Sequence, residues 1–182
     1  LQGSRFCSKA MDNRSSVLAL VEIMKQLSVR KHDADVYFVA TVQEEVGAAG
    51  AEIVAYNIDP DIAVVIDVCH GEMPDCPKEE TYTLGKGPAI GVGPILHGNL
   101  YRKLVDLAKE ENIPYQIDVE PGSTGTEAWD VQVSRSGIPT ALISIPVRYM
   151  HSAVETAHVG DIKNAGRLVA KFIELLDETE VN

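Results

Sequence analysis

The sequence predicts an α/β domain in which helices flank both faces of a largely parallel, mixed sheet. Apolar runs of strand length alternate with segments whose apolar residues recur at helical spacing. Some runs, such as 62–66 and 140–145, are continuously apolar, which is typical of strands buried on both faces. Because 45% of the 182 residues are hydrophobic, the chain can bury one sizeable core, and we expect a single domain over residues 1–182.

The first half of the chain is expected to contain two helices between strands. Residues 6–11 resemble a strand that enters the middle of the sheet, and the polar residues after them suit the start of a helix over 17–27. The run 36–42 is rich in β-branched and aromatic residues, so we expect a buried strand there. Small residues over 48–56 favour a short helix, and 62–66 follows as a strand.

The second half is expected to begin with a long loop over 70–88, which is polar and contains prolines. A helix over 99–111 and an alternating strand over 115–119 follow. The last expected elements are a helix, a buried strand and a helix that Asp161 caps, at 127–136, 140–145 and 161–176.

Composition excludes some partners. The net charge of −11 disfavours nucleic acid and anionic membrane surfaces, which require clustered Lys and Arg, and no apolar stretch reaches the length of a membrane span. Three cysteines without a framework spacing indicate a reducing compartment, so we expect a cytoplasmic protein. Cys69, His70 and Cys76 supply only three irregularly spaced ligands, which disfavours a zinc knuckle.

Acidic side chains and one imidazole follow four of the expected strands. These residues are Asp12, Glu44, Glu45, Asp67 and His151. Because active residues in α/β folds gather at the carboxyl ends of strands, we expect them to lie near one another. Carboxylates combined with imidazole suit Zn, Mn or Co, and two such metals roughly 3.5–4 Å apart can share a carboxylate. A further carboxylate can act as general base.

The adjacent pair Glu44 and Glu45 could divide these roles, because consecutive side chains of an extended segment diverge. Alternative interpretations exist for each residue taken alone. The glutamates could form a solvated strand end, Asp12 could cap a helix, Asp67 could be a turn residue and His151 an ordinary loop residue. Their joint occurrence favours the metal site.

Four segments resemble the metal-site motifs of metallopeptidase family 42, which comprises glutamyl, deblocking and tetrahedral aminopeptidases. They occur in the family's order and are AMDNR at 10–14, TVQEEVG at 41–47, IDV at 66–68 and IPVRYMHS at 145–152. Two further segments are also similar to the family, LGKGP at 84–88 and GTEA at 125–128. The resemblance implies a zinc-aminopeptidase-like catalytic domain.

The resemblance also implies a role for each residue. Asp12 would bridge two metals, Glu45 and His151 would bind one of them, and Asp67 would bind the other. Glu44 would be the general base. No substrate-binding residue is assigned.

The sequence departs from the family pattern in two respects. The family has a further metal-binding His, in a His-x-Asp motif upstream of an inserted dimerisation domain, and the sequence shows no counterpart. We therefore expect a piece of a longer protein, in which the metal on Asp67 has lost a ligand. Glu127 stands where the family more often has Asp, and no role is assigned to it.

The predicted function is that of an aminopeptidase with two divalent metal ions, zinc being preferred over cobalt or manganese, which removes the N-terminal residue from peptides. The resemblance suggests that the full-length protein forms homo-oligomers. Two alternatives remain. One is a metal-independent glycoside hydrolase that uses paired carboxylates. The other is a fragment or degenerate domain without turnover.

Overall fold

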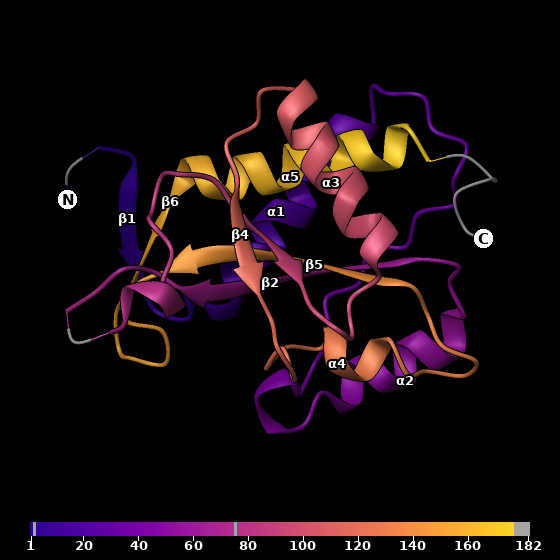
Figure 1. The fold of residues 1–182 in the computed structure, drawn as a ribbon, viewed down its shortest axis with the longest axis horizontal. Coiled ribbons are helices and arrows are strands. Elements are labelled where there is room, and N and C mark those ends of the chain that lie inside the picture. Colours follow the sequence, from indigo (N-terminus) through magenta and orange to yellow (C-terminus); the bar gives the residue numbers. More distant parts are fainter. Residues whose placement is uncertain (2, 75, 177–182) are drawn as a thin grey trace.

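A four-stranded sheet lies at the centre of the computed structural model, which describes residues 1, 3–74 and 76–176. Its order is β2 (Ala63–His70), β5 (Thr140–Val147), β3 (Ala89–Val92) and β4 (Gln116–Val119). β2 runs parallel to β5 and β3 runs parallel to β4, whereas β3 is antiparallel to β5. The sheet is therefore mixed and mostly parallel, which confirms the predicted class. In Figure 1, β3 and β4 cross the direction of β2 and β5.

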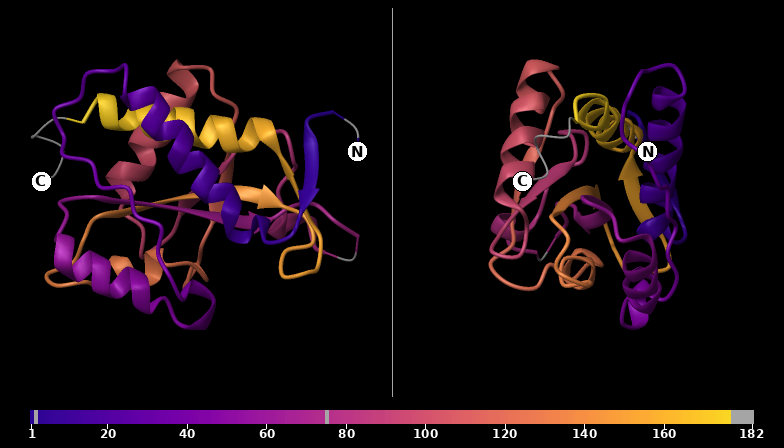
Figure 2. Two further views of the ribbon diagram at one scale, coloured as in Figure 1. Left: turned by 180° about the vertical axis from the view of Figure 1, so that it is seen from behind. Right: turned by 90° about the vertical axis from the view of Figure 1, so that its right-hand side faces the viewer.

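Helices cover both faces of this sheet (Figures 1 and 2). One face carries α1 (Met11–Leu27), α3 (Gly98–Glu110) and α5 (Val159–Glu174). The other face carries α2 (Ala49–Ile58) and the single turn α4 (Ala128–Val131). All eight residues of β5 are buried because this strand lies between the two helical layers. None of the helices in the described part of the chain is long and apolar enough to cross a membrane.

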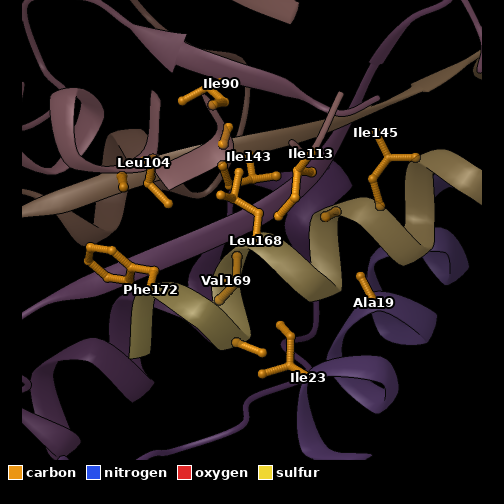
Figure 3. Close-up of a cluster of buried hydrophobic side chains, with 14 of the residues drawn as sticks. Ala19, Ile23, Ile90, Leu104, Ile113, Ile143, Ile145, Leu168, Val169 and Phe172 are labelled. Carbon is orange, nitrogen blue, oxygen red and sulfur yellow. The ribbon is translucent and has the colours of Figure 1, made fainter. Parts of the chain in front are cut away.

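The main core lies between the sheet and the layer formed by α1 and α5. Figure 3 shows Ile143 of β5 facing Leu168 of α5, with Ile145 of β5, Ile23 of α1 and Phe172 of α5 in the same cluster. These five side chains are almost completely buried. The apolar stripes of both helices thus meet the buried strand, which holds the start of α1 next to the sheet.

The first predicted strand lies outside the central sheet. Residues 6–11 were expected to enter mid-sheet, but β1 (Arg5–Ser8) pairs antiparallel with β6 (Glu155–His158) in a separate two-stranded sheet. Met11 already belongs to α1. The prediction was wrong because local composition specifies an extended segment and not the strand with which it pairs.

The predicted strand over 36–42 is also absent. This segment is irregular, although Val36 and Phe38 pack against the main core. Tyr37 and Val42 remain 67% and 65% exposed. A strand requires a neighbour that accepts and donates its backbone hydrogen bonds, and no described residue pairs with this segment in a ladder.

The last helix starts differently from the prediction. His158 is the N-cap of α5, and its Nδ1 accepts a hydrogen bond from the Gly160 amide. Asp161, which was expected to cap the helix, is fully buried. Its carboxylate instead accepts hydrogen bonds from the backbone amides of Gly85 and Gly87 at 2.7 and 2.8 Å. It thereby fastens the glycine-rich turn before β3 to α5.

The observed ranges of the other helices and strands agree with the predicted ranges to different degrees. α2, α3 and β4 lie close to their predicted ranges, while β2 and β5 extend two or more residues beyond theirs. The helix expected over 127–136 is reduced to the four residues of α4, because turns follow it before Gly137. β3 and β6 were not predicted.

Candidate metal centre

Three side chains from distant parts of the sequence form a compact cluster. One ligand atom each of Asp12, Glu45 and His151 lies within 4.8 Å of the others. His151 Nε2 is 3.1 Å from Asp12 Oδ2 and 3.5 Å from Glu45 Oε2. Asp12 comes from the start of α1, Glu45 from the 3₁₀ turn η1 (Glu44–Val46) and His151 from the loop after β5. Two carboxylates and an imidazole form a donor set that suits a divalent transition metal.

The start of α1 is shaped to present Asp12. Asp12 and Asn13 have non-helical backbone angles, and the regular helix begins after them. Asn13 Oδ1 accepts the Ser16 amide at 3.2 Å, so that Asn13 provides the capping contact of the helix. Asp12 makes no such contact, which rules out the alternative that it only caps α1.

A buried carboxylate, Glu155, holds two segments of the cluster together. Glu155 is 2% exposed at the start of β6. Its Oε2 accepts the Asp12 amide at 3.0 Å, and its Oε1 accepts the His151 amide at 2.9 Å. One side chain therefore fixes the backbone of two cluster residues relative to each other. No pattern in the sequence singled out Glu155.

Asp67 lies beside this cluster and is not part of the three-ligand group. It is 6% exposed in β2, and its Oδ1 accepts hydrogen bonds from Asn13 Nδ2 at 2.6 Å and from the Val68 amide at 2.8 Å. Because Asn13 directly follows Asp12, this hydrogen bond joins Asp67 to the segment that carries Asp12. The sequence placed Asn13 in a motif but did not indicate this role.

Glu44 and Glu45 do not extend from a strand end. They occupy the first two positions of η1, which Gln43 precedes in a left-handed conformation. The expectation of an extended segment was wrong here because residues 36–42 form no strand. The tight turn nevertheless separates the two side chains, since Glu45 joins the cluster whereas Glu44 does not.

Burial and like charges raise the pKa of several of these carboxyls. The pKa of Asp12 rises to about 6, first through burial and then through the neighbouring Glu45 carboxylate. The pKa of Asp67 rises to about 7, again first through burial, with Glu44 and Asp12 adding to it. Burial followed by Glu45 raises the pKa of Glu44. A bound cation would relieve this repulsion, so the residues fit a divalent metal.

One cavity of about 380 Å³ connects the site residues. All five residues singled out from the sequence line it: Asp12, Glu44, Glu45, Asp67 and His151. Most of the other lining residues come from the end of β2, the segment after it, the end of β4 and the loop at 124–126, and Ser144 of β5 and Met150 complete the lining. The expectation that these carboxylates and the imidazole lie near one another is therefore correct.

The three cysteines and Glu127 do not belong to the three-ligand cluster. Cys7, Cys69 and Cys76 are free thiols, and among the described residues none belongs to a group of three potential metal ligands. Glu127 is half-buried and accepts a hydrogen bond from the Thr41 hydroxyl. Burial raises the pKa of Glu127 as well.

Comparison with known proteins identifies the family. The family model for M42 glutamyl aminopeptidases matches residues 1–168. The chain belongs to this family. M42 proteins are metallopeptidases, which agrees with the acidic and imidazole cluster of this chain.

Relatives match nearly the whole chain. A lysyl aminopeptidase of Pyrococcus furiosus is 39% identical over 97% of the chain and 50% of its own length. The solved structure of the aminopeptidase APDkam598 from Desulfurococcus kamchatkensis superimposes with a TM-score of 0.89, at 42% identity over 100% of the chain and 52% of its own. The TET1 peptidase of Pyrococcus horikoshii superimposes with a TM-score of 0.79, at 32% identity over 97% of the chain and 52% of its own. This M42 chain spans about half the length of these relatives.

Proposed function

We propose that the protein carrying this chain is a dinuclear-metal aminopeptidase that hydrolyses the N-terminal residue from peptides. The observation that carries the proposal is the convergence of Asp12, Glu45 and His151 within 4.8 Å. They converge in the cavity that Glu44 and Asp67 also line. Membership of the M42 family supports the reaction class and the peptide substrate.

Each ligand has a proposed position. Glu45 and His151 would hold one ion, Asp67 would hold the other, and Asp12 would bridge them. The 3.1 Å separation of His151 and Asp12 and the link from Asn13 to Asp67 support this arrangement. Zinc is the first candidate, with cobalt and manganese as alternatives. Bound divalent ions supply Lewis acidity, which polarises a carbonyl oxygen and lowers the pKa of water.

Glu44 is the proposed general base. Its carboxylate lines the cavity outside the three-ligand cluster, and burial, followed by the Glu45 carboxylate, raises its pKa, which strengthens it as a base. Glu44 would take a proton from the attacking water and return it to the leaving amine. The partly enclosed cavity would limit competing solvent around this proton transfer.

The geometry disfavours the glycoside hydrolase alternative. Carboxyl pairs of such enzymes lie roughly 5–9.5 Å apart across a sugar ring and need no metal. Asp12 and Glu45 instead bring their oxygens within 4.8 Å of each other and share an imidazole. Hydrolysis of a glycoside in the presence of a chelator would favour the alternative.

Oligomerisation and location are further parts of the proposal. The TET1 relative is described as assembling into a tetrahedron or a large octahedral shell. We therefore expect the whole protein to form homo-oligomers. The free state of its three cysteines supports a cytoplasmic location.

The two glutamates provide the decisive test. Glu44→Gln should keep the metal content, because Glu44 is outside the cluster, and should lower kcat by roughly 10²–10⁴-fold. Glu45→Gln should weaken metal binding. Metal content is measured on the chain by equilibrium dialysis. Turnover is measured with aminoacyl p-nitroanilides on a chimera in which this chain replaces the matching half of the Pyrococcus furiosus relative. Loss of metal in Glu44→Gln alone would reverse the roles, and a metal-loaded chimera without turnover would support a degenerate domain.

A further inference from the structure

The segment that carries Glu44 and Glu45 is shaped mainly by local contacts. Residues 36–43 form neither a helix nor a strand, and η1 is a single 3₁₀ turn. The backbone hydrogen bonds of the turn are short in sequence, such as the one from the Ala48 amide to the Gln43 carbonyl at 2.8 Å. Local bonds determine the shape of the turn, but they do not orient it relative to the sheet.

The backbone on both sides of η1 is in the left-handed region. Gln43 has a φ of 66° and Ala48 a φ of 51°. Residues with a Cβ atom rarely adopt this conformation, and it persists where surrounding contacts compensate for its steric cost. The turn that presents the two glutamates therefore needs a contact with a part of the domain outside itself.

The side chain of Thr41 provides such a contact. Its hydroxyl donates a hydrogen bond to Oε1 of Glu127, which is 86 residues away in the sequence. Apart from the cluster contacts of Glu45, it is the only hydrogen bond that joins residues 36–47 to a described residue outside 36–50. Because the acceptor is a carboxylate, this hydrogen bond is stronger than one between neutral groups.

Glu127 itself extends from a fixed part of the domain. It directly precedes α4, and the next residue, Ala128, is completely buried beside Leu142 of β5. The Ala128 amide donates to the hydroxyl of Thr126 at 3.3 Å, and that hydroxyl is 2.9 Å from the hydroxyl of Thr124. The core and these hydrogen bonds together hold the Glu127 carboxylate in place.

We propose that Glu127 is a positioning residue, which fixes the segment of Glu44 and Glu45 through the hydroxyl of Thr41. This inference rests on the proposed function, since it concerns the base and one metal ligand of that same site. The loop at 124–126 lines the cavity that the two glutamates line, so the hydrogen bond joins two segments of the cavity wall.

The first test measures hydrogen exchange on the metal-free chain by NMR. Thr41→Val removes the hydroxyl and keeps the shape of the side chain, whereas Thr41→Ser keeps the hydroxyl. The amides of Val46, Gly47 and Ala48 donate hydrogen bonds within the turn. Their exchange should become about tenfold faster in Thr41→Val and stay near the wild-type rate in Thr41→Ser.

The second test changes the acceptor. Glu127→Leu should act like Thr41→Val, whereas Glu127→Gln keeps an acceptor oxygen and should retain most of the protection. The double variant Thr41→Val/Glu127→Leu should exchange no faster than either single variant, because both changes remove the same hydrogen bond. Glu52→Leu is the matched control, since Glu52 is exposed on α2 and does not line the cavity. Melting temperatures establish that each variant is folded.

The consequence for the site is measured by zinc affinity on the chain and by turnover of the chimera. Thr41→Val should lower zinc affinity and kcat about tenfold each, because it displaces Glu45 and Glu44. The KM should change little, since neither glutamate is assigned to peptide binding. Thr41→Ser should restore both quantities, which a general loss of stability at this position does not predict.

Each outcome decides the inference. Equal exchange rates in Thr41→Val and Thr41→Ser would overturn it, as would additive effects in the double variant. Unchanged zinc affinity in Thr41→Val would also overturn it where Glu45→Gln weakens zinc binding. If Glu45→Gln left zinc binding intact, the proposed function would fail, and the exchange rates alone would decide whether Glu127 fixes the segment.

Discussion

Individual buried carboxylates of this chain fix the candidate site through hydrogen bonds to backbone amides. Glu155 is buried, and its carboxylate accepts one hydrogen bond from the backbone amide of Asp12 and one from that of His151. Charge-assisted hydrogen bonds of this kind are stronger than neutral ones. We therefore propose Glu155 as a positioning residue for the proposed metal ligands.

Removing this support should weaken metal binding. Glu155→Ala leaves the Asp12 and His151 amides without this partner, and we expect zinc affinity to fall about 10–100-fold. Glu155→Gln keeps one good acceptor and should lose less. Competition with a chromogenic chelator measures both affinities, and Glu110→Gln on the exposed end of α3 is the control. Unchanged affinity in folded Glu155→Ala would exclude the positioning role.

Glu120 should also make stability depend on pH. Its folded-state pKa of about 7 exceeds the ordinary value of 4.5, mainly because it is buried and then because it faces Asp118. The folded state thus retains a proton that the unfolded chain releases. The resulting stability is complete below about pH 4.5 and is lost as the pH rises through 7.

The variant Glu120→Gln removes this titration. Between pH 5 and pH 8, the wild type should lose about 1 kcal/mol more free energy of unfolding than the variant, after allowance for solvent screening of a partly exposed group. Urea denaturation of both chains at each pH measures the difference. If the free energies of unfolding of the two chains changed in parallel with pH, the pKa of Glu120 would not be raised in the folded state.

Helix packing determines where Asp12 lies. α1 and α5 pack closely at Gly166, where an added Cβ would come within 2.8 Å of the Glu22 side chain and 3.1 Å of the Ala19 carbonyl. The absence of a side chain at Gly166 lets the two helices approach. Since Asp12 lies at the start of α1 and Glu155 lies just before α5, this crossing also sets the geometry of the cluster.

A larger residue at this crossing should destabilise the fold. Gly166→Val forces the backbones apart, and we expect a loss of about 1–3 kcal/mol in the free energy of unfolding. Gly98→Ala is the matched control, because a Cβ there meets only the Arg102 side chain at 3.6 Å. Thermal unfolding of the two variants provides the comparison. A Gly166→Val chain as stable as Gly98→Ala would mean that the helices are not packed as described.

The whole chain should bind one metal ion tightly. In the described part of the chain, only Asp12, Glu45 and His151 form a three-ligand group, and Asp67 lies outside it. We therefore expect a stoichiometry of one tight zinc ion per chain by equilibrium dialysis. At a free zinc concentration 100-fold above the Kd, binding should add about 2.7 kcal/mol and raise the melting temperature by about 5–10 °C. His151→Ala should abolish this shift. Two tight ions would mean that another residue, such as His70, completes a second site on Asp67.

Much of the architecture could be predicted because it depends on local patterns. The continuously apolar run of β5 and the helical spacing of α3 are properties of neighbouring residues, and both elements formed close to where they were predicted. The candidate site residues could be named as well, because their motifs stand at the ends of apolar runs. Only Asp67 and His151 lie in or after a strand of the central sheet, so the cavity that all five residues share also depends on long-range packing.

Only the tertiary structure decided how these segments pair and what holds the site. The apolar segment 36–42 is not a strand, because strand formation depends on a hydrogen-bonding neighbour and no described residue is one. Glu155 and Asp161 have no local signature, since their partners are backbone amides far away in the sequence. Residue type and spacing therefore determined the chemistry available to this chain. The long-range contacts of buried carboxylates determined its geometry, which no local pattern encodes.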